Sequence, residues 1–139
     1  MFVQAEESNN VATNKEMHTK ASLASNALLT IETFSKSREK FQALRGHVIV
    51  VCYDVAGRAI WLSQDYQCTT RCGTWDACAS SGTDVWIEDF PDQVGNYTTH
   101  LDIVHSDEGL GDARKTFITA INQSAEIAEE IKKIRDKLS

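Results

Sequence analysis

Two long stretches of the chain repeat apolar residues at helical spacing. The first begins at Met17, places apolar residues four and three positions apart, and is followed by Gly46, a residue suited to end a helix. The second runs from Ala113 to Leu138 and keeps the same alternation of four and three, with charged residues around it. The pattern therefore predicts helices over residues 16–45 and 112–138, each with a heptad-like apolar seam.

The two seams are candidate contact surfaces. In the terminal helix the segment through Ala128 has an apolar face broad enough to pack on the protein's own sheet, whereas the last two turns keep only a narrow seam. A narrow seam is typical of helix–helix contacts, so we expect a homodimer or a helical protein partner. The residues expected at this contact are Leu28, Ile31, Ile127, Ile131, Ile134 and Leu138.

Between the helices the pattern changes to that of strands. A dense β-branched run, a turn at Ala56-Gly57 and a second apolar run together predict a β-hairpin. Two further runs are separated by a turn that contains the only proline of the chain. The four expected strands cover residues 47–55, 59–66, 84–90 and 97–105.

The order of these elements predicts the fold class. Residues 1–15 are polar and unpatterned, and we expect a flexible lead. Residues 16–139 then form a single α+β domain, a four-stranded antiparallel meander sheet flanked by long N- and C-terminal helices.

The hairpin from Val48 to Trp61 has an apolar strand that ends in Asp54, a short turn through Gly57 and Arg58, and a second strand. In this form it resembles the central hairpin of PAS, Cache and Roadblock-type modules. The resemblance is confined to the hairpin and implies a similar outline of the fold. Turn chemistry alone explains Asp54 and Gly57, and no functional residue carries over.

Composition narrows the classes of partner. Apolar residues make up 42% of the 139 residues and charged residues 24%, which is ordinary globular usage. The formal net charge of −6 argues against a nucleic-acid binder and against an anionic membrane surface. No apolar run reaches the roughly 18 residues of a membrane span, so we expect no direct insertion into a membrane.

Three cysteines lie in a loop rich in Thr, Ser and Gly. The spacing of Cys68, Cys72 and Cys78 does not fit paired zinc-ribbon or common iron–sulfur patterns, so we expect neither a metal nor a cofactor. A disulfide within this loop is the preferred interpretation, and it requires an oxidising, extracytoplasmic compartment. Cys52 lies among valines and is expected to be a buried thiol.

The aromatic residues offer a candidate ligand pocket. Trp61, Trp75 and Trp86, with Tyr53, could line a small-molecule site between the sheet and the loop, although tryptophans in small sheets are more often core. His100, Asp102 and His105 lie on one expected strand. Alternation places His100 and Asp102 on one face and His105 on the other, so a solvated strand face is preferred to an acid–base site.

No nucleophile or acid–base set converges in the sequence, so a non-enzymatic function is expected. We expect a signalling or sensory module that binds a ligand or partner and dimerises or transmits through its terminal helices. An adaptor that caps a coiled coil and a secreted, immunity-type acidic binding protein are the alternatives.

Overall fold

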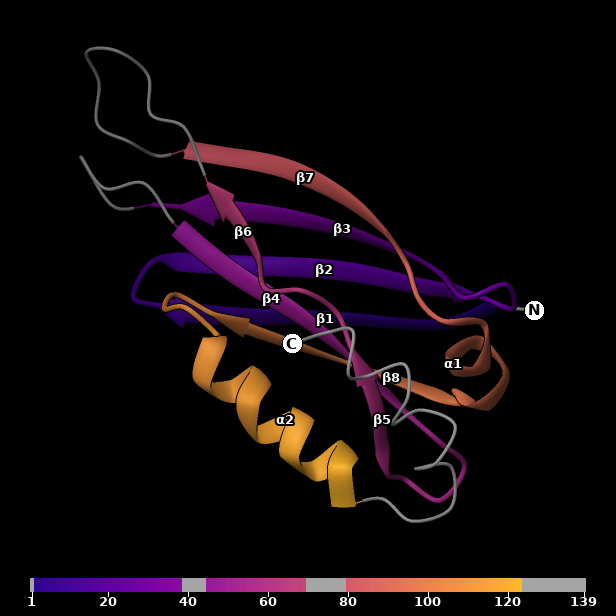
Figure 1. Cartoon of the computed structure of the whole chain (residues 1–139). Coiled ribbons are helices and arrows are strands. Elements are labelled where there is room, and N and C mark those ends of the chain that lie inside the picture. The colour runs from indigo at the N-terminus through magenta and orange to yellow at the C-terminus, as the bar shows by residue number, and fades with distance from the viewer. Residues whose placement is uncertain (1, 39–44, 70–79, 124–139) are drawn as a thin grey trace.

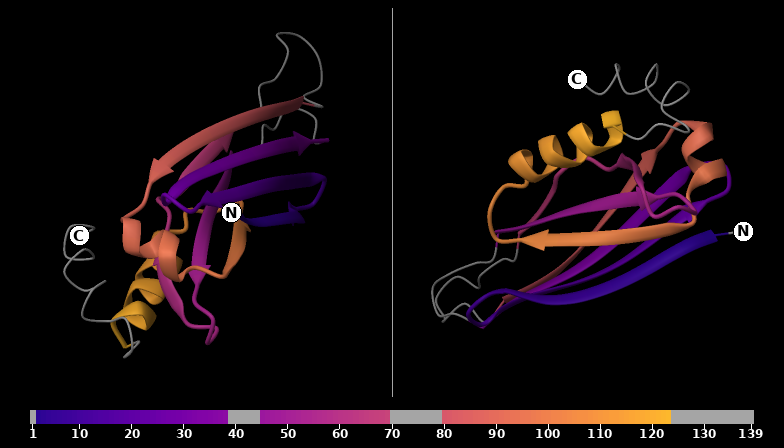
Figure 2. Two further views of the ribbon diagram at one scale, coloured as in Figure 1. Left: turned by 90° about the vertical axis from the view of Figure 1, so that its right-hand side faces the viewer. Right: turned by 90° about the horizontal axis from the view of Figure 1, so that it is seen from below.

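Eight strands and two short helices make up the part of the chain that the computed structural model describes, which is residues 2–38, 45–69 and 80–123. The strands form two antiparallel sheets that face each other across one apolar core (Figures 1 and 2). The helices are α1 (Asp92–Tyr97) and α2 (Gly111–Gln123). Neither helix has the length and apolar character that crossing a bilayer requires.

Sheet A contains the first three strands of the chain and one later strand. Its spatial order is β1 (Phe2–Ala12), β2 (Lys15–Ala24), β3 (Leu28–Ser37) and β7 (Ser80–Asp89). Asn14 and Ala27 turn the two hairpins with positive φ angles of 59° and 66°. Alternate residues of β2 and β3 point into the core, beginning with Met17 and Leu29.

Sheet B is built around β4 (Arg45–Tyr53). One edge of β4 pairs with β8 (His100–Ser106), and the other pairs with β6 (Tyr66–Thr69) and then β5 (Ala59–Leu62). Residues 48–52 of β4 are completely buried. Both faces of this strand are covered, because sheet A lies on one side and α2, which packs on β5, lies on the other.

The expected N-terminal helix over 16–45 is wrong, since residues 15–24 and 28–37 form β2 and β3 and residue 45 begins β4. The inward positions of these strands include Thr19, Thr33, Ser35 and Ser37, all buried. Because these buried positions are polar, the apolar residues alone do not show the two-residue period of a strand. The remaining apolar residues fall at helical intervals by coincidence. Gly46 lies in β4, where an added Cβ would come 2.5 Å from Sδ of Met17, so it permits close packing of the sheets and caps no helix.

The expected flexible lead over residues 1–15 is also wrong. Residues 2–12 form β1, which pairs with β2 along its whole length. Leu28 and Ile31 therefore belong to a strand: Ile31 is buried between the sheets, and Leu28 lies half-buried at the start of β3. Neither residue lies on a helical seam.

The fold is thus a mostly β, two-sheet structure, which overturns the α+β meander flanked by long helices. The third expected strand pairs with β3 instead of continuing a meander after β5. Helix α2 spans 13 residues and packs on β5. The seam residues expected at the C-terminus, Ile127, Ile131, Ile134 and Leu138, lie outside the described residues.

Candidate functional site

Strand β7 forms one open edge of sheet A. All ten of its residues pair with β3, and within the described residues no other strand pairs with it. Figures 1 and 2 show it as the outermost strand of the sheet. The edge that faces away from β3 therefore presents a row of backbone N–H and C=O groups that can pair with another strand.

The outward face of this edge is apolar at its centre. Val85 is 55% exposed and Ile87 is 65% exposed, two positions apart on the same face of β7. Phe34 of β3 is 42% exposed and pairs with Thr83, which places it diagonally next to Val85. We call Phe34, Val85 and Ile87 the edge patch.

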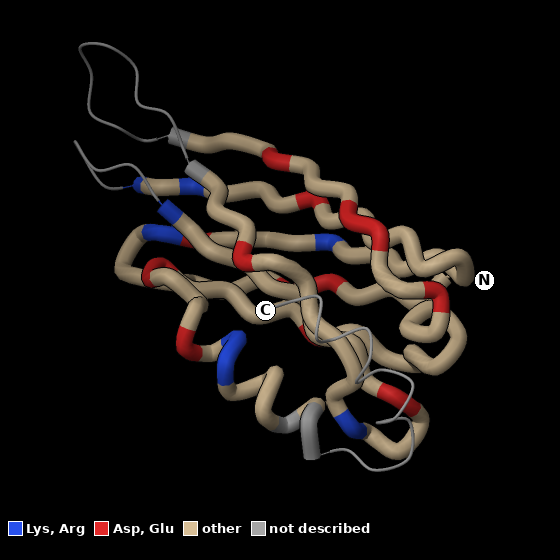
Figure 3. Tube along the Cα trace, viewed as in Figure 1, with Lys and Arg blue, Asp and Glu red and all other residues tan. Residues whose placement is uncertain are grey.

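Strand β7 lacks three of the devices that protect edge strands: a lysine, a proline and a bulge. Soluble proteins discourage edge pairing with lysine, proline or a bulge. Residues 80–89 contain no lysine, arginine or proline, and the register with β3 runs without a shift. The charged residues of this strand are Asp84, Glu88 and Asp89, all acidic (Figure 3).

The inward face of β7 is anchored to sheet B. The ring of Trp86 stacks on Tyr66 of β6, with centroids 5.0 Å apart and planes 20° from parallel. The Tyr66 hydroxyl donates to Oε1 of Glu88 at 2.5 Å, and the Gln64 backbone N–H donates to the same oxygen at 3.1 Å. Burial, together with the Glu88 carboxylate, raises the pKa of Tyr66. Contacts on the inward face of β7 therefore fix the position of the strand whose outer edge is free.

Three of the four residues expected to line an aromatic pocket are described, and each packs against a different ring. Trp61 is buried and packs edge-on against Phe90, with centroids 6.3 Å apart. Trp86 stacks on Tyr66, whereas Tyr53 lies beside His100 at a centroid distance of 5.8 Å. Trp75 lies outside the described residues.

Four grooves of about 420–510 Å³ open on the surface that the structure describes. None of these four is lined by the aromatic residues expected in a pocket. The largest lies between β1 and β8, and its wall includes Asn9, Asp102 and His105. These four grooves are therefore not the expected aromatic site, which stays a prediction.

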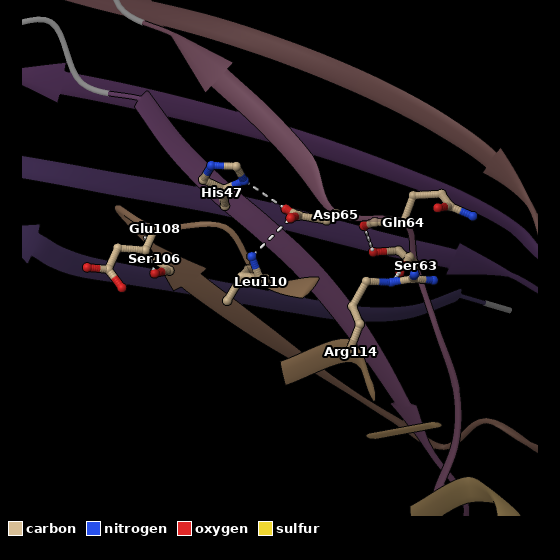
Figure 4. Close-up of polar contacts among 8 residues, drawn as sticks. All are labelled: His47, Ser63, Gln64, Asp65, Ser106, Glu108, Leu110 and Arg114. Atoms are coloured by element: carbon tan, nitrogen blue, oxygen red, sulfur yellow. Dashed lines mark hydrogen bonds and ion pairs between the residues drawn. The ribbon is translucent and has the colours of Figure 1, made fainter. Parts of the chain in front are cut away.

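A polar cluster fastens α2 to sheet B (Figure 4). Oδ1 of Asp65 lies 3.0 Å from Nδ1 of His47, and Oδ2 accepts a hydrogen bond of 3.0 Å from the Leu110 N–H. Nε of Arg114 donates to the Ser63 carbonyl at 3.0 Å. We call these five residues the α2 clasp. No local pattern in the sequence reveals the clasp, because its parts come from three segments that only the fold brings together.

The clasp contains a serine, a histidine and an aspartate, but they are not arranged as a nucleophilic triad. Ser63 is fully buried, its hydroxyl donates to the Gln64 carbonyl at 2.9 Å, and it accepts the Val50 N–H at 2.9 Å. The Asp65 carboxylate contacts His47 with one oxygen and the Leu110 N–H with the other, whereas the Ser63 hydroxyl bonds to Val50 and Gln64. This geometry positions a helix.

The strand alternation expected for β8 is confirmed. His100 and Asp102 are exposed, whereas His105 turns toward sheet A. Nε2 of His105 lies 2.6 Å from the Thr19 hydroxyl, and Nδ1 lies 2.8 Å from Oδ1 of Asn9. Burial, together with nearby His18, lowers the pKa of His105 to about 4. His105 therefore joins the two sheets as a neutral imidazole, where a solvated strand face was expected.

Two of the four cysteines lie in the described residues, and both are free and buried. Burial raises the pKa of Cys52 to about 12. Sγ of Cys68 accepts a hydrogen bond of 2.9 Å from the Ser35 hydroxyl. Cys72 and Cys78 lie outside the described residues, so a disulfide between them stays a prediction. Within residues 2–38, 45–69 and 80–123, no three His, Cys, Asp or Glu residues gather as metal ligands would.

Strand β7 and its edge patch thus differ most from an ordinary solvated surface, because an open strand edge and exposed apolar side chains occur together there. No family model matches this chain significantly, and neither does any curated protein or solved structure.

Proposed function

We propose that this chain is a non-enzymatic protein-interaction module, and that its partner docks on the edge patch of sheet A. One observation carries the proposal: Val85 and Ile87 are more than half exposed, two positions apart on the same face of an edge strand that has no lysine, proline or bulge. Apolar side chains grouped at an open edge are typical of interaction sites, whereas single exposed apolar residues are common everywhere.

The rest of the molecule supports a rigid presenting surface. The edge patch lies over a strand that is paired along its whole length with β3 and anchored by the Tyr66–Trp86 stack. A surface that is already ordered loses little conformational freedom on binding. A signalling role is compatible with this proposal. Transmission of a signal through an N-terminal helix is not, because residues 15–24 and 28–37 form strands.

The test uses affinity selection of displayed random dodecapeptides on the immobilised protein. We expect enriched peptides to bind the double variant Val85→Thr/Ile87→Thr at least tenfold more weakly, because threonine keeps the β-branched shape and removes apolar contact. Val55→Thr is the matched control, since Val55 is 88% exposed in the turn between β4 and β5. Peptides that bind the double variant as well as they bind the wild type would refute the edge patch as the docking surface.

A further inference from the structure

We propose that the partner binds as an added strand alongside β7, through an extended segment in which basic side chains flank two apolar ones. This inference rests on the proposed function, because it names the partner of the same edge patch. It differs from that proposal in specifying backbone pairing and the charge of the partner.

The backbone of β7 is suited to strand addition. It is ten residues long, it pairs with β3 without a bulge, and no other strand pairs with it among the described residues. In an added strand, alternate residues would exchange N–H and C=O bonds with the free edge. The Tyr66–Trp86 stack and the bonds to Glu88 lie on the inward face and leave the strand direction unchanged.

The outward side chains set the apolar part of the recognised sequence. A strand next to β7 places its residues directly opposite those of β7, with side chains alternating in the same way. Residues opposite Val85 and Ile87 would extend the apolar surface of the edge patch. The partner therefore carries two apolar residues two positions apart.

The acidic residues set the charged part. Glu88 already accepts two hydrogen bonds from sheet B, whereas Asp84 and Asp89 have no hydrogen bond or ion pair with any described residue. Asp84 lies on the inward face with Trp86 and Glu88, and Asp89 lies on the outward face. Lysine or arginine opposite each of them would give both carboxylates a partner on its own face. Read along β7 from Asp84 to Asp89, the partner pattern is basic, apolar, any, apolar, any, basic.

The same charges disfavour a second copy of this chain as the occupant. Each β7 carries three carboxylates and no basic residue, and the net charge of the chain is −6. Pairing two such edges would gather six carboxylates along one seam. A basic partner removes this repulsion, so the complementary segment belongs to a different, basic sequence.

The experiment uses two labelled peptides whose cores are Lys-Val-Thr-Val-Thr-Lys and its reverse, Lys-Thr-Val-Thr-Val-Lys, because an added strand can run in either direction. Fluorescence anisotropy gives the Kd of each. We expect one of them to bind at least tenfold more tightly than its Lys→Glu counterpart and to weaken as salt rises. The Val85→Thr/Ile87→Thr variant should bind at least tenfold more weakly, with Val55→Thr unchanged.

Backbone pairing is tested on the peptide, so the result does not depend on the folding of a protein variant. Alternate N–H groups of a strand point to opposite edges, so N-methylating one alternate set should abolish binding while methylating the other set should leave it within about threefold. Equal effects of both sets would overturn strand addition, and equal binding of the Lys and Glu peptides would overturn the basic partner. Either result leaves the edge patch itself supported if Val85→Thr/Ile87→Thr still weakens binding.

Two further outcomes also count against the inference. Failure of both peptides to bind would overturn it, whereas the library selection judges the edge patch separately. A dimer in sedimentation velocity that Val85→Thr/Ile87→Thr dissociates would identify a second copy as the occupant.

Discussion

The Nε2 atom of His105 lies 2.6 Å from the hydroxyl of Thr19, and this contact joins a strand of sheet B to the interior of sheet A. The Thr19 hydroxyl also lies 2.8 Å from that of Thr33, so the imidazole ends a short buried row of hydroxyls. Each hydroxyl can donate or accept, but a protonated imidazole can only donate. Protonation would leave the ring charged in a partly desolvated position.

Lowering the pH from 7 to 5 is therefore expected to destabilise the protein through His105. Its pKa is about 4 in the folded state, against 6.5 for an ordinary imidazole. The unfolded chain binds the proton first, so stability present above pH 6.5 is lost as the pH falls toward 4. Because His105 is partly exposed, we expect a loss of about 1 kcal/mol by pH 5, measured by urea unfolding.

The variant His105→Gln isolates this effect, because glutamine can hydrogen-bond but does not titrate near these pH values. Its stability should change less than that of the wild type between pH 7 and pH 5. His18→Gln is the control that keeps His105 and should retain most of the loss. Equal pH dependence in His105→Gln and the wild type would contradict the assignment.

Gly95→Ala is expected to destabilise the protein by about 1–3 kcal/mol, although alanine is the better residue for a helix. A Cβ at this position of α1 would lie 2.8 Å from the Ser25 carbonyl oxygen and 2.9 Å from the Ala27 nitrogen. Both atoms are backbone, so the hairpin turn itself would have to move. Gly109→Ala is the control, because its Cβ would meet no atom within 4 Å. Equal thermal midpoints for the two variants would refute the close approach.

Cys52 and Cys68 are expected to resist alkylation in the folded protein. Burial raises the pKa of both thiols, that of Cys52 to about 12, and the thiolate is the reactive form. Mass-mapped alkylation at pH 8 should label neither in native buffer and both in denaturant. The same map would show whether Cys72 and Cys78 need reductant before labelling. Rapid native labelling of Cys52 would contradict its burial.

The raised pKa of Cys52 also predicts a loss of stability in alkali. The folded state keeps its proton up to about pH 12, whereas an ordinary thiol loses it near 9. Stability is therefore complete below pH 9 and falls as the pH rises from 9 toward 12. In Cys52→Ala this part of the alkaline loss should disappear, as followed by urea unfolding at pH 8 and pH 10.

Asp65→Ala is expected to cost about 1–3 kcal/mol and to loosen α2. The substitution leaves the Leu110 N–H and the His47 ring without their carboxylate partner. Hydrogen exchange of the first-turn amides of α2 should accelerate. Asp107→Ala is a matched control, since Asp107 is an exposed aspartate in the connection between β8 and α2. Unchanged exchange in Asp65→Ala would show that packing on β5 alone holds the helix.

The residues explain which parts of the fold the sequence could predict. Strand β4 is a dense β-branched run, and Gly57 turns with a positive φ of 79°, so both were recognisable locally. Strands β2 and β3 were misassigned as a helix because inward-facing positions such as Thr33 and Ser35 are polar. A pattern built on apolar residues alone cannot show that these side chains are buried.

The candidate site depends on information that no local pattern contains. The segment of β7 was predicted to be a strand. Its position beside β3, with one edge open, was not predicted. The exposure of Val85 and Ile87 follows from that placement. Trp61 and Trp86 were expected to line a ligand pocket, whereas the fold packs them against Phe90 and Tyr66.

The insertion of β7 beside β3 also constrains how the chain reaches its native state. Sheet A is complete only when Trp86 of β7 pairs with Ile31 of β3. The segment that forms β4, β5 and β6 lies between these two strands in the sequence. Neither sheet comes from one continuous piece of chain, so neither is an independent folding unit. Pairings this distant in sequence slow the search for the folded state. We therefore expect slow, single-exponential refolding, and an unpaired β3 exposed to intermolecular pairing until β7 arrives.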